Sequence, residues 1–217
     1  MRIDPAGWPF IGGALLLGIL AEWFIGPGGA AIFLVLACFF LFFFRDPDRP
    51  ITGEANAVLS PADGRVMIAG APAGHGCPPG NWQQISIFLS PMDVHVNRMP
   101  IGGRVTKVEY HPGRFLPAYK TEAGDLNEYT EVTLDHAGQV IVVRQIVGVL
   151  ARRIVCRVRQ GDAVKAGDRF GVMKFGSRMD IFVPASATIT AKVNEKVVGG
   201  VTVIARLARQ EAAPYTT

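Results

Sequence analysis

The sequence predicts a mainly β domain, a barrel or sandwich, behind an N-terminal hydrophobic helical hairpin. Three observations predict it: two apolar segments fill the first 45 residues, short segments rich in Val, Ile and Phe follow, and Gly, Pro, Asp and Asn separate them. Helical periodicity is scarce beyond residue 50. A chain of 217 residues is long enough for one sizeable domain with an appendage.

The hairpin is predicted over residues 1–45. Trp8–Ile25 is interrupted only by Glu22, and Ala30–Phe44 carries no charge, although its 15 residues are fewer than the ~20 that usually span a bilayer. A buried core hairpin and a cleaved signal peptide are the alternatives. The signal peptide is disfavoured, because the apolar material comes twice and lacks a clear cleavage site. Glu22 is expected near a helix end or facing the partner helix.

Basic residues on both flanks of the hairpin orient it. Arg2 on one side and Arg45 and Arg49 on the other place both ends in the cytoplasm by the positive-inside tendency. We therefore expect a protein of the inner cell membrane with its soluble domain on the cytoplasmic face. The net charge is +4, and the sequence contains no Lys/Arg block of the kind typical of nucleic-acid binding. A mildly basic domain beside a membrane instead indicates attraction to anionic lipid headgroups. Three widely spaced cysteines indicate neither a disulfide framework nor a zinc site.

The soluble domain is predicted over residues 46–217, beginning at the charged, proline-containing segment 45–50. Its expected strands are short and rich in β-branched and aromatic residues. They cover residues 57–59, 65–69, 83–89, 103–110, 130–134, 140–149, 154–159, 170–175, 180–183, 188–193 and 201–206.

One stretch of this domain resembles the lipoyl and biotinyl carrier folds. Gly161–Asp168 has their strand-turn-strand pattern, and Met173-Lys174-Phe175 is similar to the biotinylated Met-Lys-Met. A non-catalytic, membrane-tethered carrier or adaptor modified on Lys174 is therefore an alternative. A modified lysine needs the tip of an exposed hairpin, however, whereas Lys174 is soon followed by Gly-Ser and a hydrophobic strand.

Ser177 is the candidate nucleophile. A serine on a tight turn after Gly176 can attack the glycine carbonyl, because glycine lets the backbone bend where a side chain would clash. The resulting ester can eliminate and leave a ketone at the new N-terminus. An ordinary turn is the bland alternative. A serine hydrolase is disfavoured, because no Gly-x-Ser-x-Gly elbow surrounds Ser177.

Four separated motifs together resemble one family, the short-form phosphatidylserine decarboxylase proenzymes. Their order and spacing agree over essentially the whole chain, and two smaller segments support them. The motifs are Phe43–Pro47, Ser60–Gly64, Asp93–Pro100 and Phe175–Ser177, and the supporting segments are Tyr110–Phe115 and Asn127-Glu128.

The resemblance implies a pyruvoyl enzyme that cuts itself between Gly176 and Ser177. The products would be a β chain of residues 1–176 and an α chain of residues 177–217, paired as a heterodimer, with pyruvoyl in place of Ser177. The pyruvoyl carbonyl would form a Schiff base with the amine of phosphatidylserine and accept electrons as CO2 leaves, giving phosphatidylethanolamine. Neither pyridoxal phosphate nor a metal is required, and the membrane and a phospholipid are the expected partners.

The resemblance also implies roles for individual residues. His95 would serve as base on Ser177 or as proton donor after decarboxylation, and Asp63 would orient it. Long-form members carry a second histidine where this chain has Arg98, which cannot readily take a proton. Either His95 performs both duties or His111 substitutes.

Several cationic or acidic residues are candidates for substrate binding. Arg98 can hold a carboxylate or phosphate through its planar fork, and a solvated loop charge is the alternative. Lys174 and Arg178 flank the cleavage site and can attract a headgroup phosphate, unless they are simply solvated. Glu128 is a further acid/base candidate. The sequence leaves open an acyl or an ether lipid and the depth of insertion, and a homodimer through strand edges fits it.

Overall fold

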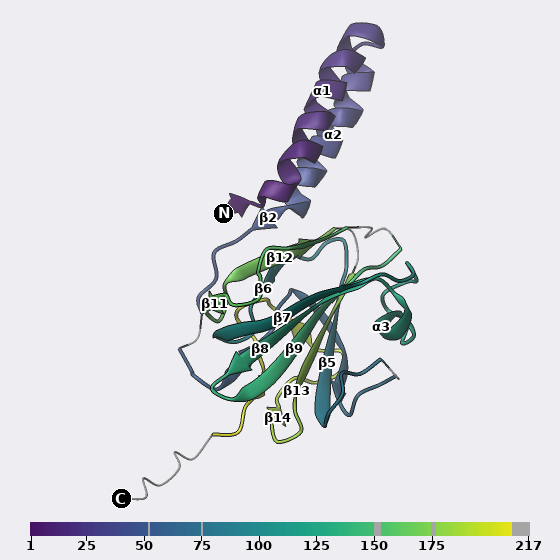
Figure 1. The fold of residues 1–217 in the computed structure, drawn as a ribbon. Coiled ribbons are helices and arrows are strands. Elements are labelled where there is room, and N and C mark those ends of the chain that lie inside the picture. Colours follow the sequence, from purple (N-terminus) through teal and green to yellow (C-terminus); the bar gives the residue numbers. More distant parts are fainter. Residues whose placement is uncertain (52, 75, 150–152, 175–176, 210–217) are drawn as a thin grey trace, which may run out of the picture.

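The computed structural model describes residues 1–51, 53–74, 76–149, 153–174 and 177–209. A helical hairpin projects from one end of a β domain (Figure 1). Helix α1 covers Trp8–Phe24 and α2 covers Pro27–Phe43, with a short 3-10 turn, Pro5–Gly7, ahead of α1. Gly26 has a φ of 98°, a conformation that glycine adopts without steric cost, and it reverses the chain between the helices. The predicted hairpin is confirmed, with α2 beginning three residues earlier than expected.

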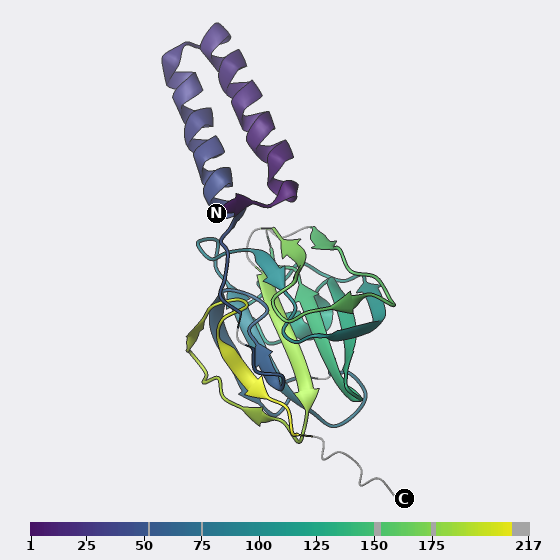
Figure 2. The ribbon, with the colours of Figure 1, turned by 90° about the vertical axis from the view of Figure 1, so that its left-hand side faces the viewer.

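The base of the hairpin is closed by a small ladder. Strand β1, Arg2–Ile3, pairs antiparallel with β2, Arg45–Asp46, so the two ends of the hairpin lie on the same side. The two helices run side by side away from this ladder (Figure 2).

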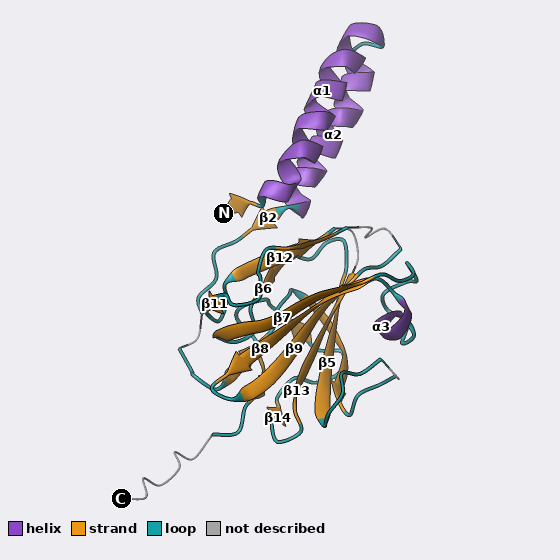
Figure 3. Cartoon of the chain, viewed as in Figure 1, coloured by secondary structure: helices purple, strands orange, loops and turns teal. Residues whose placement is uncertain are grey.

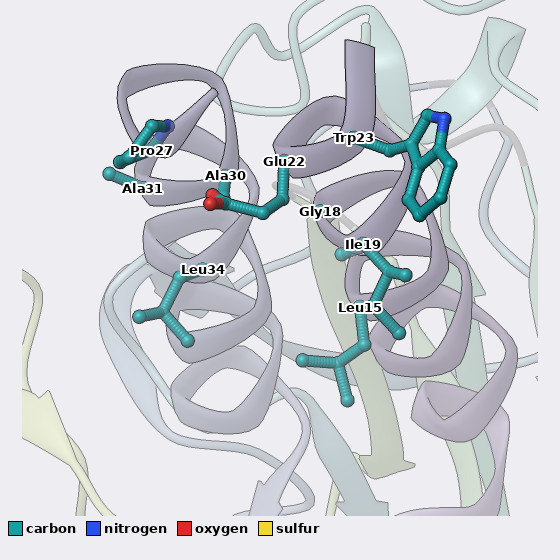
Figure 4. A pocket seen from close by; sticks show the side chains of 10 residues that line it. Leu15, Gly18, Ile19, Glu22, Trp23, Pro27, Ala30, Ala31 and Leu34 are labelled. Atoms are coloured by element: carbon teal, nitrogen blue, oxygen red, sulfur yellow. The ribbon is translucent and has the colours of Figure 1, made fainter. Parts of the chain in front are cut away.

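The hairpin exposes apolar side chains that water would disfavour. Ile19 is 69% exposed and Val35 is 70% exposed. The segment Pro5–Phe24 is long and apolar enough to cross a membrane, whereas α2 is shorter. Glu22 lies two residues before the end of α1 and its carboxylate extends toward α2 beside Ala30 (Figure 4), which agrees with both positions expected for it. These features indicate association of the hairpin with a membrane.

The β domain is built around one eight-stranded antiparallel sheet of order β11-β7-β8-β9-β13-β5-β4-β15. Its strands β7, β8, β9, β13 and β5 are labelled in Figure 3. Alternating residues of its strands form the main hydrophobic core. The strands are β4 Gly64–Gly70, β5 Trp82–Leu89, β7 Gly103–His111, β8 Tyr129–His136, β9 Gln139–Ile146, β11 Ala163–Val164, β13 Ser177–Pro184 and β15 Lys196–Val197.

Two three-stranded antiparallel sheets complete the domain, in the orders β10-β12-β6 and β14-β16-β3. Strands β6 and β12 lie at the end of the domain nearest the hairpin (Figure 1). The bounds are β3 Ala57–Leu59, β6 Val96–Arg98, β10 Ile154–Cys156, β12 Arg169–Met173, β14 Thr188–Ile189 and β16 Val203–Arg206, and a short helix, α3, covers Ala123–Leu126.

The mainly β prediction is confirmed, with differences in detail. The predicted strand over 188–193 is only two residues long, and the one over 154–159 stops at Cys156. The unpredicted strands β6, β11 and β15 have two or three residues each, too few for an alternating pattern to show. The large sheet ends in two different edge strands, β11 and β15, so pairing among the described residues does not close it into a barrel.

Candidate active site around Ser177

Ser177 lies where the chain passes from one sheet to another. Strand β12 of the small sheet ends at Met173, and β13 of the large sheet begins at Ser177, opposite Leu89 of β5. The Ser177 side chain is fully buried, and its hydroxyl has no hydrogen-bond partner among the described residues. Phe175 and Gly176, which include the predicted cleavage position, lie outside those residues. A buried hydroxyl without a partner is costly, which marks Ser177 as unusual for a structural serine.

His95 lies beside the chain that leads to Ser177. Its carbonyl accepts a hydrogen bond from the backbone N–H of Met173 at 3.3 Å. Its ring Nδ1 is 2.9 Å from the carbonyl oxygen of Asp93. Because a carbonyl only accepts, Nδ1 carries the proton and Nε2 keeps its lone pair. Nε2 is buried, with no partner among the residues described. This is the tautomer that a general base needs.

The end of the membrane hairpin covers the His95 ring. Phe43, the last residue of α2, stacks on the imidazole with ring centroids 4.0 Å apart, and both side chains are fully buried. Burial lowers the pKa of His95 from 6.5 to about 4, and the carbonyl and charge of Asp93 oppose this only in part. The imidazole is therefore neutral at physiological pH.

Asp63 is engaged at a different place. Its carboxylate accepts hydrogen bonds from Arg49 at 2.8 Å and from the backbone N–H of Gly199 at 2.8 Å. The contact that fixes the His95 ring comes instead from the Asp93 carbonyl. The orienting role predicted for Asp63 stays a prediction.

Arg98 forms a buried ion pair with the segment that follows the hairpin. Its guanidinium donates to Asp46 at 2.6 Å and to the carbonyl oxygens of Pro47 and Gly167, and the residue is 4% exposed. Asp46 also pairs with Arg169 of β12. These bonds fasten the base of the hairpin to β6 and β12, so Arg98 is not a solvated loop charge.

Arg178 is likewise used inside the domain. It makes a bidentate ion pair with Asp180, at 2.6 and 2.8 Å, and donates to the hydroxyl of Ser86 at 3.1 Å. The residue is 1% exposed, so the alternative of a solvated charge is wrong here as well. A headgroup phosphate would reach this guanidinium only if the pair opened.

Lys174 is the predicted phosphate ligand that lies at the base of the hairpin. Its ammonium stands over the ring of Phe10 of α1, 4.7 Å from the centroid. Burial, followed by the charge of Arg153, lowers the pKa of Lys174. The residue is half-buried and sits between the hairpin and the domain.

His111 and Glu128 lie where the end of β7 meets the start of β8. His111 stacks on Tyr129 at 4.4 Å, and the Glu128 carboxylate is hydrogen-bonded to the Tyr110 hydroxyl. In the ladder, His111 is opposite Tyr129, Tyr129 opposite Ile146, and Ile146 opposite Arg178. Three interstrand steps of ~4.8 Å place His111 about 14 Å from the start of β13. This favours His95 over His111 as the base that serves Ser177.

Comparison with known proteins agrees with the geometry. The sequence profile of the phosphatidylserine decarboxylase family matches residues 36–205. A phosphatidylserine decarboxylase proenzyme of Symbiobacterium thermophilum is 43% identical over 206 residues, covering 93% of this chain and 94% of the relative. The chain belongs to the phosphatidylserine decarboxylase family. A proenzyme of Paraburkholderia xenovorans is 40% identical, covering 93% of this chain and 95% of the relative. One of Chlorobium phaeobacteroides is 48% identical, covering 78% of this chain and 79% of the relative.

Family membership confirms the predicted resemblance and decides between the functional alternatives. Phosphatidylserine decarboxylase proenzymes yield two chains from one precursor and use a pyruvoyl group made from their own chain. The chain is accordingly a pyruvoyl-dependent carboxy-lyase, and the carrier or adaptor alternative is wrong. Among the described residues, the Ser177 hydroxyl and His95 Nε2 are buried without a hydrogen-bond partner, so both atoms are left to bind a further polar group.

Sequence reasoning did not single out three buried residues of this candidate site. Phe43 was noted only as part of a motif, yet its ring covers His95. Asn97 and Gln145 are fully buried amides joined by a hydrogen bond of 2.8 Å. A signal was available for Gln145, because it and Arg144 interrupt the otherwise apolar run 140–147, and a buried polar residue is costly unless it is bonded or used.

Proposed function

We propose that Ser177 is the residue that becomes the pyruvoyl group, by self-cleavage between Gly176 and Ser177, and that His95 is the base for this step. The observation that carries the proposal is that two fully buried groups near the end of β12 have no hydrogen-bond partner among the described residues. They are the Ser177 hydroxyl and the Nε2 atom of the neutral His95 imidazole. Cleavage there gives a β chain of residues 1–176 and an α chain of residues 177–217.

The proposed proton transfers follow from the tautomer of His95. In the precursor, Nε2 accepts the proton of the Ser177 hydroxyl as its oxygen attacks the preceding carbonyl carbon, while Nδ1 stays bonded to the Asp93 carbonyl. The same proton passes to the nitrogen of residue 177 as the C–N bond between residues 176 and 177 breaks, which leaves an ester. Elimination of the ester releases the carboxylate of the β chain, and water then displaces the nitrogen of residue 177 as ammonia to leave the pyruvoyl carbonyl. During turnover the same Nε2 can take a proton from the substrate ammonium, which must be neutral to act as a nucleophile. Phe43 excludes water from this face of the ring. Asp63 is kept in the proposal as the residue that orients His95.

A pyruvoyl group at position 177 supplies a carbonyl that condenses with the substrate amine and accepts the electron pair released with CO2. The substrate is phosphatidylserine, and the products are phosphatidylethanolamine and CO2. The chain's own residues bind and orient the lipid. Lys174 supports a headgroup site, because the residue is only partly buried and its ammonium lies at the base of the hairpin over the Phe10 ring. Arg98, Arg178, His111 and Glu128 are kept as weaker substrate-binding candidates.

The membrane arrangement supports a lipid substrate. The exposed apolar hairpin covers residues 1–45, the catalytic domain covers residues 46–217, and His95 lies under the last residue of α2. Arg2, Arg45 and Arg49 favour the cytoplasmic face of the inner membrane. A lipoyl-like barrel-sandwich arrangement and a homodimer through exposed strand edges belong to the same proposal.

The proposal is tested by assaying the purified full chain in detergent micelles with phosphatidylserine labelled in the serine carboxyl group. The starting protein should release labelled CO2, whereas Ser177→Ala should release none and remain one chain. His95→Gln should be cleaved slowly or not at all, and His111→Gln, the matched histidine control, should be cleaved normally. Normal cleavage of His95→Gln together with failure of His111→Gln would reverse the assignment of the base.

A further inference from the structure

A pair of buried amides lies next to the proposed catalytic residues. Gln145 of β9 donates from Nε2 to Asn97 Oδ1 at 2.8 Å and to the carbonyl oxygen of Val155 at 3.4 Å. A carbonyl only accepts, so Val155 fixes which end of the Gln145 amide is the donor. Gln145 then fixes the orientation of Asn97. Among the described residues, the atoms of this pair left without a partner are the Asn97 Nδ2 donor and the Gln145 Oε1 acceptor.

The register places this amide pair on the Ser177 face of the large sheet. Gln145 is opposite Met179, and Ser177 lies two residues before Met179, on the same face. Gln145 and Ser177 are therefore diagonal neighbours, a relation that places Cα atoms ~7–8 Å apart. Gly171 of β12 leaves the space that the amide occupies, because a Cβ there would lie 2.5 Å from Gln145 Nε2.

The same few residues hold most of the unsatisfied polar atoms. Within the described part of the chain, five buried side-chain atoms lack a hydrogen-bond partner, and four of them belong to His95, Asn97, Gln145 and Ser177. Each of these side chains is 0% exposed. A buried polar atom left unpaired is costly, so four in neighbouring residues indicate a polar group that they bind in the working enzyme.

We infer that Asn97 is a catalytic residue whose Nδ2 donates a hydrogen bond to a carbonyl oxygen of residue 177 in its pyruvoyl form, and that Gln145 is the positioning residue that aims it. The inference rests on the proposed role of Ser177. A carbonyl oxygen offers acceptors only, and Asn97 Nδ2 is the donor of the pair that remains unused. A neutral amide keeps its N–H at any pH. A fixed donor is most effective where negative charge develops, as it does when CO2 leaves.

The test uses the full chain in detergent micelles with three variants. Asn97→Asp keeps the shape and the oxygen that accepts from Gln145 but removes the donor. Gln145→Met removes the fixing contacts at similar volume. Gln84→Met is the matched control, because Gln84 is a buried glutamine of β5, on the other side of β13 from β9, whose amide atoms bond to Ala73, Ser86 and Asp180.

Each variant is measured for cleavage by intact mass, for kcat and KM with phosphatidylserine, and for the rate at which the cleaved chain reacts with phenylhydrazine, a carbonyl reagent followed by absorbance. We expect Asn97→Asp to lower kcat about 10²–10³-fold with a much smaller change in KM, and to slow the hydrazine reaction. Gln145→Met should lower both rates about tenfold or more, and Gln84→Met should change neither by that much.

A kcat of cleaved Asn97→Asp within about threefold of the starting protein would overturn the inference. So would equal losses in Gln145→Met and Gln84→Met, because the effect would then be structural. If Asn97→Asp folds but is not cleaved, the test rests on the cleaved Gln145→Met protein. A kcat and a hydrazine rate in Gln145→Met equal to those of the starting protein would then overturn the assignment. Cleavage and CO2 release by the starting protein report separately on the role of Ser177.

Discussion

Acidification should destabilise the folded chain through the buried imidazole of His95. Burial lowers its folded-state pKa from 6.5 to about 4. The unfolded chain therefore binds this proton more readily, so the free energy of unfolding falls as the pH drops below 6.5 and the loss is complete below about pH 4. A gap of about 2.5 pKa units, at ~1.36 kcal/mol per unit, amounts to about 3 kcal/mol, of which about 2 kcal/mol is lost by pH 5.

The assay is denaturant unfolding in detergent micelles between about pH 5 and pH 7.5, on Ser177→Ala chains that stay in one piece. His95→Gln in the same background removes the titrating group. We expect the stability advantage of the His95 protein over His95→Gln to shrink by about 2 kcal/mol on acidification. His136→Gln, which leaves His95 in place, should keep the full pH dependence. A difference that is constant over this range, or that grows as the pH falls, would refute the reasoning.

Two further substitutions test contacts that the sequence did not reveal. Phe43→Ala should raise the pKa of His95 toward 6.5 by more than about one unit, as followed by NMR of the histidine rings. Phe39→Ala is the control and should not raise it, because the Phe39 ring packs on Phe43, with ring centroids 5.9 Å apart. Arg178→Met should lower the free energy of unfolding by about 3–5 kcal/mol because it leaves Asp180 buried without its ion pair, and adding Asp180→Leu should recover most of the loss. A stable Arg178→Met enzyme with a raised KM would instead support the headgroup role.

The hairpin and most long strands could be predicted, because each repeats one kind of residue at a regular spacing. The apolar run 30–44 contains no charge, and β5, β8 and β9 are rich in β-branched and apolar residues. Strand β6, Val96–Arg98, escaped prediction because two of its three residues are polar. Its pairing with β12 depends on a chain segment about 75 residues away, which no local pattern encodes.

The candidate site was predictable in part for the same reason. Ser177 and His95 lie in motifs that the family shares, so resemblance was enough to select them. The surroundings of Arg98 and Arg178 could not be predicted, because they consist of residues that only folding brings together. Arg98 bonds to Asp46, which is 52 residues away in the sequence, and Arg178 donates a hydrogen bond to Ser86 of β5. A local sequence gives the charge of an arginine and leaves its burial undetermined.

The central claim is that residue 177 becomes the pyruvoyl group, and intact mass spectrometry of the purified full chain tests it most directly. The account predicts one chain that ends at Gly176 and a smaller one that begins at position 177. The smaller chain should carry the mass of a pyruvoyl group in place of the serine. Ser177→Ala should give one uncut chain. A single unmodified chain from folded protein that releases CO2 from phosphatidylserine, or a cut at another residue, would contradict the account.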